Sequence, residues 1–207
     1  MAITNFDSNK FCLHQVGYFY GGLSGKTGKD FGRGESKYIT FLNVINNVIA
    51  KEELTDFVNI KNGEKQNKVA KNDLLFNGSS ETPEEVAFPS LVTEPLEGLY
   101  LNSFCFGFRF EKLDKVDPLF FAYYLRSNHG RQFISQLAQG STRYNISKTA
   151  LSNIEWNLPE IEEQKIIAKA LNDINELIAK TRLVIDKHVG LRNGMMNDLL
   201  TGKVRLV

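Results

Sequence analysis

The sequence predicts a mixed α/β globular domain followed by one long carboxy-terminal helix. Short apolar segments with the two-residue period of strands are spread over the first three quarters of the chain. A proline-free run then follows Pro159, and its apolar residues repeat at heptad spacing. With 42% hydrophobic and 11% aromatic residues, the 207-residue chain can form a core, which excludes a disordered protein. We therefore divide the chain into two parts, residues 1–157 and 158–207.

Strands are predicted from the alternation of apolar and other residues. The clearest is 104–110, where a phenylalanine at every second position predicts an aromatic face turned to the core. A flexible polar loop is predicted at 21–29, because glycine and lysine dominate it. Shorter strands are expected at 16–20, 38–42, 73–76 and 154–158.

Helices are predicted where capping residues precede apolar residues at helical spacing. Asp117 is suited to be an N-cap, with Pro118 at the first helical position. We expect that helical region to be interrupted near Gly130 and to end at Gly140. Ser147 is expected to cap a short turn.

The long helix is predicted to begin with Pro159 in its first turn, followed by glutamates that favour the positive end of the helix dipole. About 40 helical residues reach roughly 60 Å, which is more than the width of a small domain. An apolar face of that length needs another helix, unless the segment is an ordinary terminal helix packed on its own core. The expected helix interface consists of Ile167, Leu171, Ile174, Leu177, Ile178, Val184, Ile185 and Leu191.

Composition excludes several classes of protein. Two cysteines, Cys12 and Cys105, are too few for a disulfide scaffold, and no apolar run opens the chain as a secretory signal would. No stretch approaches the ~20 apolar residues that span a bilayer, so no membrane partner is expected. We expect a cytoplasmic location. The net charge of +1 gives no bulk attraction to a polyanion.

No catalytic, cofactor or metal site is predicted. Gly25-Lys26-Thr27 resembles part of a P-loop, but Tyr20 occupies the position of the first glycine. No two prolines are adjacent, so the Pro-Pro motif of amino-methyltransferases is absent. The three histidines, His14, His129 and His188, lie too far apart for a common zinc module.

Two polar loops instead carry residue types that recognise DNA through its phosphates and base edges. Charge is segregated, because the run from 119 to 154 contains four basic residues and no acid. Taken alone, each loop is also compatible with a solvated turn. The candidate DNA contacts are Lys26, Lys29, Arg33 and Lys37 in the first loop, with Ser141, Thr142, Arg143, Tyr144, Asn145 and Lys148 in and after the second.

Three ordered motifs resemble the specificity subunit of type I restriction-modification enzymes. Residues 158–168, Leu-Pro-Glu-Ile-Glu-Glu-Gln-Lys-Ile-Ile-Ala, are similar to the family's Leu-Pro-Pro-Leu-x-Glu-Gln-x-x-Ile-Ala entry to its long helix, with Glu160 replacing a proline. Residues 140–147 resemble its Gly-Ser/Thr-rich segment ending in Ile-Ser. Residues 198–205 resemble the close of its helical regions. The resemblance spans essentially the whole chain.

The resemblance implies a target-recognition domain that reads DNA, and a helix that pairs as an antiparallel coiled coil. Full family members carry two of each in roughly twice this length, whereas this chain has one of each. A homodimer of half-length subunits would read an inverted-repeat gapped site, and pairing with a different half-subunit would give an asymmetric site. The length fits both a half-length gene and a piece of a longer one.

Chemistry would then belong to partners. The resemblance implies methyltransferase subunits that use S-adenosylmethionine and an ATP-dependent endonuclease and translocase subunit, directed to double-stranded DNA by this non-catalytic chain. The alternative is an assembly or inhibitory factor, which binds the methyltransferase through its helix without reading DNA. A small enzyme with an unrecognised site is a third possibility.

Overall fold

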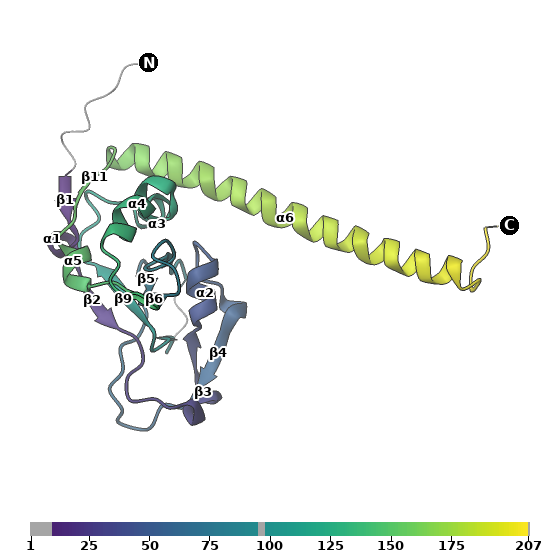
Figure 1. Cartoon of the computed structure of the whole chain (residues 1–207), viewed down its shortest axis with the longest axis horizontal. Coiled ribbons are helices and arrows are strands. Elements are labelled where there is room, and N and C mark those ends of the chain that lie inside the picture. Colours follow the sequence, from purple (N-terminus) through teal and green to yellow (C-terminus); the bar gives the residue numbers. More distant parts are fainter. Residues whose placement is uncertain (1–9, 95–97, 207) are drawn as a thin grey trace, which may run out of the picture. The chain divides into compact units, whose positions relative to one another are not determined.

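The structure, a computed structural model, describes residues 10–94 and 98–206 (Figure 1). It divides into two compact units, Met1–Lys165 and Ile166–Val207. A mixed α/β arrangement with a long carboxy-terminal helix, α6 (Ile161–Leu200), confirms the predicted α/β domain and the predicted helix, while the pairing of that helix as a coiled coil stays a prediction. The functional boundary at residues 157 and 158 stays a prediction.

The first unit is built on a four-stranded antiparallel sheet. Three of its strands correspond to those predicted at 16–20, 73–76 and 104–110, which are confirmed with ends shifted by at most one residue. The order of the sheet is β2 (Gly17–Gly21), β9 (Cys105–Phe110), β5 (Leu74–Asn77) and β7 (Pro89–Leu91).

The phenylalanines of β9 follow the prediction only in part. Phe106 and Phe108 are buried and pack with Phe19 and Phe76 from the neighbouring strands. Phe104, however, precedes the strand and is 62% exposed, because the Asn102 side chain accepts a hydrogen bond from its amide and the chain turns there. The period-two pattern therefore extends one residue too far.

A second, three-stranded sheet has the order β4 (Thr55–Val58), β3 (Phe31–Ile39) and β8 (Tyr100–Leu101). The strand predicted at 38–42 is wrong beyond Ile39. Thr40 leaves the sheet and caps helix α2 (Phe41–Asn46), its hydroxyl accepting a hydrogen bond from the amide of Asn43 at 3.2 Å. A capping threonine therefore ends the strand sooner than its apolar neighbours indicate.

Two short antiparallel pairs complete the unit. β1 (Lys10–Cys12) pairs with β11 (Glu155–Asn157), which confirms the strand predicted at 154–158. β10 (Tyr144–Asn145) pairs with β6 (Ser79–Ser80). The remaining short elements are α1 (Leu13–Val16), η1 (Gly28–Asp30), η2 (Glu52–Leu54) and α5 (Lys148–Ser152), the last capped by Ser147 as predicted.

A buried polar network connects strands β2, β5 and β9. Asp73 is fully buried and accepts hydrogen bonds from the Tyr20 hydroxyl at 2.7 Å and from Arg109 at 2.9 and 2.7 Å. Burial and the neighbouring carboxylate raise the pKa of Tyr20, so it stays a neutral donor. Because every member has a partner, the network fixes the register of β2, β5 and β9 without leaving an unpaired charge.

The predicted helical region is two helices, α3 (Pro118–Arg126) and α4 (Asn128–Gln136). Asp117 caps α3 as predicted, accepting a hydrogen bond from the amide of Phe120 at 2.8 Å. The break lies at Ser127, three residues before the predicted Gly130, because the Ser127 hydroxyl caps α4. Gly130 allows close packing instead, since a Cβ there would lie 2.2 Å from the Tyr124 carbonyl oxygen. The region ends at Gln136, before Gly140.

The first turn of α6 is held in the globular unit by Gln164. This side chain is fully buried, accepts a hydrogen bond from the amide of Asp117 at 2.8 Å and donates to the carbonyls of Lys115 and Pro159 at 2.9 and 2.7 Å. The helix begins at Ile161 rather than with Pro159 at the first helical position, and Pro159 supplies one of these acceptors. Gln164 thus joins the end of the domain to the start of α3.

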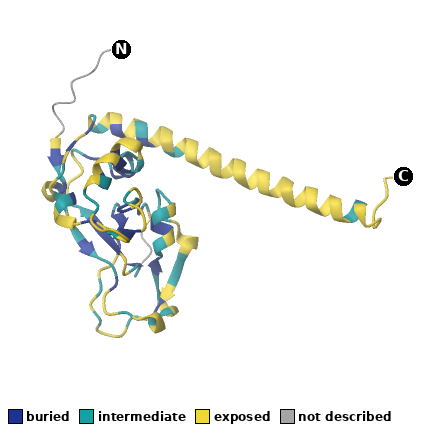
Figure 2. Cartoon of the chain, viewed as in Figure 1, coloured by how far each residue is buried: buried dark blue, intermediate teal, exposed yellow. Residues whose placement is uncertain are grey.

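The second unit is the remainder of α6 and the residues after it. Figure 2 shows its residues as almost entirely exposed, and no helix of the described residues is long and apolar enough to cross a membrane.

We predict that Gln164→Ala lowers the free energy of unfolding by about 2 to 3 kcal/mol, because it leaves an amide and two carbonyls without their partner. Denaturant unfolding followed by the fluorescence of Trp156, the single and buried tryptophan, measures this change. The control Glu163→Ala removes an exposed neighbour and should cost less than about 1 kcal/mol. Equal losses in the two variants would contradict the assigned role of Gln164.

Candidate nucleic-acid interface

The first predicted loop is partly a strand. Residues 22–27 lack regular structure as expected, but residues 31–39 form β3, so Arg33 and Lys37 lie on a strand and their placement in a loop is wrong. The reason is a bulge between Phe31 and Ser36, where Gly32 and Gly34 adopt positive φ and hide the strand pattern. Lys29 and Arg33 are exposed.

Two of the four predicted cations of this segment are already paired. The side chain of Lys26 is only 3% exposed, and its ammonium donates to Glu64 at 2.6 Å and to the carbonyl of Asn59 at 2.7 Å. Lys37 lies 3.6 Å from Glu52, but 42% of its side chain stays exposed. Lys26 therefore holds the loop to the 59–64 segment, and we leave it out of the proposed interface.

The second predicted loop lies on a different part of the domain. Its Tyr144 and Asn145 form β10 rather than a loop, because they pair with Ser80 and Ser79 of β6. Gly140 makes the tight entry to this strand, with a φ of 139° and no room for a Cβ beside the Arg143 carbonyl. Ser141, Thr142, Arg143, Asn145 and Lys148 are exposed and Tyr144 is half-buried.

Arg143 is positioned by two neighbours from outside the loop. Its Nε donates to the hydroxyl of Ser79 at 3.2 Å, and its guanidinium lies 5.8 Å from the centroid of the Phe104 ring. Lys148, the first residue of α5, lies 5.4 Å from the centroid of Phe106. These contacts place two exposed cations near the amino-terminal end of β9. We call Arg143, Asn145, Lys148 and Phe104 the β10 cluster.

The other two cations of the acid-free run are structural. Arg126 donates to carbonyls of the 44–47 turn and to Pro89, and Arg131 donates to carbonyls of residues 84, 86 and 87. Both guanidiniums lie against the Phe88 ring, at 4.9 and 4.6 Å. Burial lowers the pKa of each to about 10. The sequence pattern therefore overstates the positive charge available to a ligand.

The two predicted loops are held in place by contacts with different parts of the domain. These contacts do not bring the loops into one cluster. The first is fixed by the 59–66 segment, and Figure 1 shows β3 and β4 at the far end of the domain from β1 and β11. The second is fixed by β6 and by the turn before β9. Sequence reasoning missed Ser79 and Phe104, which lie 64 and 39 residues before Arg143 and meet it only in the tertiary fold.

Residues 9–186 match the model of a family described as "Type I restriction modification DNA specificity domain". The chain belongs to this family. The resemblance drawn from the three motifs is thus confirmed. A specificity domain is a non-catalytic DNA-recognition unit, so the prediction that the chain is not itself an enzyme is confirmed by its family.

Known relatives agree with this membership. The chain is 36% identical over 95 residues to the type I restriction enzyme MjaVIII specificity subunit of Methanocaldococcus jannaschii, a match that covers 46% of this chain and 22% of the relative. Its structure is similar to that of the type I S subunit from M. genitalium, with a TM-score of 0.59 at 17% identity over 96% of this chain and 47% of the other. The HsdS subunit from Thermoanaerobacter tengcongensis gives 0.57 at 16% identity, over 87% and 41%. These structures share the fold, and the specificity domain spans less than half of each.

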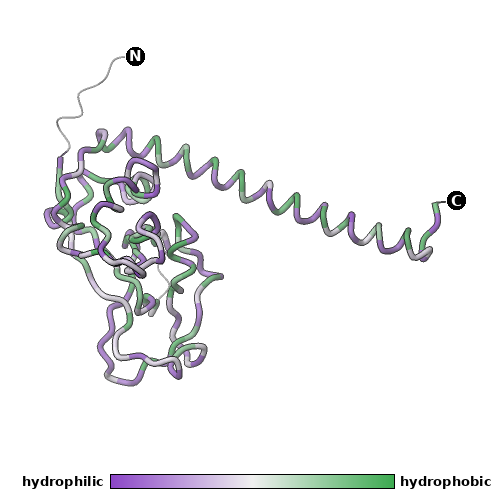
Figure 3. Tube along the Cα trace, viewed as in Figure 1, coloured by the Kyte–Doolittle hydropathy of each residue, from purple (hydrophilic) through white to green (hydrophobic). Residues whose placement is uncertain are grey.

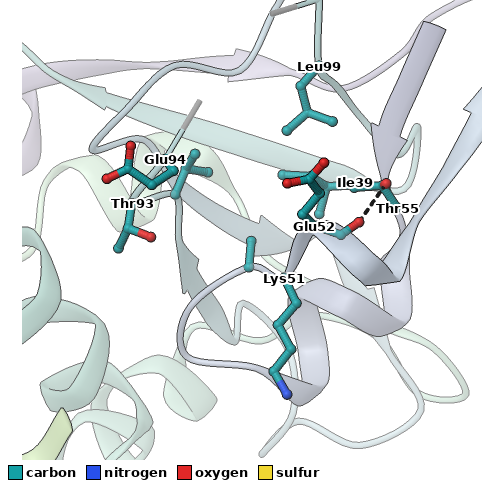
Figure 4. Close-up of a pocket in the computed structure, with 9 residues that line it drawn as sticks. Ile39, Lys51, Glu52, Thr55, Thr93, Glu94 and Leu99 are labelled. Carbon is teal, nitrogen blue, oxygen red and sulfur yellow. Dashed lines mark hydrogen bonds between the residues drawn. The ribbon is translucent and has the colours of Figure 1, made fainter. Parts of the chain in front are cut away.

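The specificity domain also has a small pocket of about 90 Å³, lined by residues of η2 and β3, by residues 92–94 and by Leu99 (Figure 4). Glu52 and Glu94 line it beside Lys51, and the Thr55 hydroxyl donates to the Glu52 carbonyl at 2.7 Å. Its volume is below the ~300 Å³ at which ligand pockets begin. Two carboxylates at its wall also disfavour a phosphate.

We predict that the ion pair between Lys26 and Glu64 gives this specificity domain a pH-dependent stability. Hydrogen bonds from Lys26, Gln66 and the Lys61 amide lower the pKa of Glu64 to about 2. A carboxyl with a lowered pKa stabilises the fold above its ordinary pKa of 4.5 and loses that contribution as the pH falls toward 2. The loss of stability on Glu64→Gln should therefore be greatest near neutral pH and shrink between pH 4.5 and 2.

Denaturant unfolding of the wild type and of Glu64→Gln at several pH values measures this difference. Glu94→Gln is the matched control, because Glu94 is 84% exposed and only 3.4 Å from an exposed Lys71. A Glu64→Gln effect that does not vary with pH would refute the assignment.

Proposed function

We propose that the chain is a sequence-specific DNA-recognition subunit of a type I restriction-modification complex that reads one half of a gapped site. The observation that carries the proposal is the match to the DNA specificity family over residues 9–186, together with an exposed β10 cluster of base-reading residue types. A second copy, joined through α6, supplies the other half. The site is then an inverted repeat.

The β10 cluster supports base recognition through its residue types and its pairing state. Arginine reads guanine, and asparagine reads adenine, through two hydrogen bonds to the base edge in the major groove. Within residues 10–94 and 98–206, no carboxylate forms an ion pair with Arg143 or Lys148. Their charges are therefore directed to solvent, where a duplex would meet them.

The 29–37 segment supports a separate role at the phosphates. Lys29 and Arg33 are exposed, and Lys37 keeps nearly half its side chain accessible. Arg33 lies in the bulge of β3 between two glycines, which sets it apart from the paired strand. Phosphate contacts fix orientation without carrying sequence information, so we assign Lys29, Arg33 and Lys37 to positioning.

The apolar face of α6 supports self-association. Of the eight interface residues predicted from the sequence, seven are between 39% and 64% exposed, and Ile167 is half-buried. Figure 3 shows hydrophobic residues recurring along the length of the helix. Contiguous exposed apolar surface of this kind marks an interaction site. We propose that a second α6 covers it as an antiparallel coiled coil, and that both recognition units are thereby held at a fixed spacing.

Methyltransferase and endonuclease subunits would carry the chemistry of this complex, and the chain would direct them to their site. The test is selection of binding sequences from random DNA by the full chain with its methyltransferase partner. A gapped consensus supports the proposal. Salt-sensitive binding without a consensus would reduce the chain to a phosphate clamp, and binding of the methyltransferase alone would favour the assembly-factor alternative.

We predict that Arg143→Ala relaxes the base preference at one position of each half-site and weakens binding by about 1 to 3 kcal/mol for each half-site. The matched variant Lys29→Ala should weaken binding to all sequences alike and reduce the salt dependence, because it removes a phosphate contact. Binding titrations on the consensus and on its single-base variants measure both effects. Uniform weakening by Arg143→Ala would reassign that residue to the phosphates.

We also predict that the double variant Ile174→Asp, Ile178→Asp yields monomers, because it buries two carboxylates in the helix interface. The matched control places the same residue on the opposite face of α6, as Lys180→Asp with Lys187→Asp, and should keep the dimer. Sedimentation equilibrium measures the mass, and circular dichroism shows that the helix persists. An unchanged mass of the isoleucine variant would refute the interface.

A further inference from the structure

Phe104 is an exposed aromatic residue within the β10 cluster. Its side chain is 62% exposed, although the other phenylalanines of the 104–110 segment are buried or half-buried. An exposed phenyl ring forgoes the favourable free energy of transfer from water to a protein core. Its position on a recognition surface therefore needs a reason. No folding role of the ring accounts for it, because the ring lies outside β9 and outside the core.

The backbone presents the ring at a fixed place. The Phe104 amide donates to the Asn102 side chain at 2.9 Å, and the Phe104 carbonyl accepts from the amide of Gly78 at 2.8 Å. A Cβ on Gly78 would lie 2.8 Å from that carbonyl oxygen, so this approach requires glycine. The turn is thus held from both sides before any ligand arrives, and the ring loses little backbone entropy on binding.

The surroundings of the ring favour a nucleic-acid ligand over a protein. The Arg143 guanidinium lies 5.8 Å from the ring centroid, and Lys148 lies over the neighbouring Phe106. Only Nε of Arg143 takes part in a hydrogen bond among the described contacts, which leaves its two terminal nitrogens for a base edge. The apolar area of one ring is far smaller than that of a stable protein–protein interface. A single ring beside cations without an ion-pair partner suits DNA instead, where it can contact a thymine methyl group while the cations meet a polyanion.

We propose that Phe104 is a specificity-determining residue that contacts the C5-methyl group of a thymine in the major groove, beside the base read by Arg143. This inference rests on the proposed DNA-recognition function. Apolar side chains recognise thymine through this methyl group, which is the one apolar feature of the groove. Because base pairs are stacked about 3.4 Å apart, a separation of 5.8 Å between guanidinium and ring places the thymine one or two steps from the Arg143 base.

The experiment replaces each thymine of the selected consensus by deoxyuridine, which removes only the methyl group. Binding of the full chain with its methyltransferase partner is then titrated for the wild type and for Phe104→Ala. At one thymine of each half-site, within two steps of the position that responds to Arg143→Ala, deoxyuridine should weaken wild-type binding about fourfold, the ratio equivalent to one buried methyl group. Phe104→Ala should bind the thymine and deoxyuridine sites equally.

Phe57→Ala is the matched control, because Phe57 is also an exposed phenylalanine, at 46%, but lies on β4 outside the β10 cluster. It should retain the fourfold preference for thymine. A Phe104→Ala variant that keeps this preference, or that weakens all sites alike, would overturn the inference while leaving the consensus and the proposed function intact. If the wild type selects no consensus, the proposed function fails and the inference fails with it.

Discussion

The exposed apolar face of α6 sets the main physical requirement for the assembly of this chain. Rows of isoleucine, leucine and valine stay largely exposed along a helix of 40 residues. Exposing apolar surface to water costs free energy in proportion to its area. Isolated apolar residues are common on protein surfaces, but they do not form rows at heptad spacing. We propose that a partner helix covers this face. In the proposed dimer, this partner brings a second recognition unit and with it a second DNA half-site.

The recognition surface shows that the number of cations in a sequence does not measure the charge offered to DNA. The acid-free run from 119 to 154 contains four basic residues. Two of them, Arg126 and Arg131, donate hydrogen bonds to backbone carbonyls and pack against Phe88. Of the four basic residues in that run, only Arg143 and Lys148 are exposed. The net charge of +1 is consistent with this small number of exposed cations, because the base contacts that carry specificity need few charges.

Sequence patterns predicted those parts of the fold that local rules determine. The cap at Asp117, the strand at β9 and the extent of α6 follow from capping, alternation and heptad spacing, and the structure contains each of them. Long-range partners were beyond such rules. The bulge in β3 depends on pairing with β4, and the burial of Lys26 depends on Glu64, 38 residues later. Phe104 looked like a core residue because alternation cannot show where a strand begins.

In the proposed assembly, α6 joins two copies of the recognition unit. Sedimentation equilibrium of the purified wild-type chain over a range of concentrations tests it most directly. The account predicts twice the mass of the chain, with dissociation only on dilution. A single-chain mass at every concentration would contradict it.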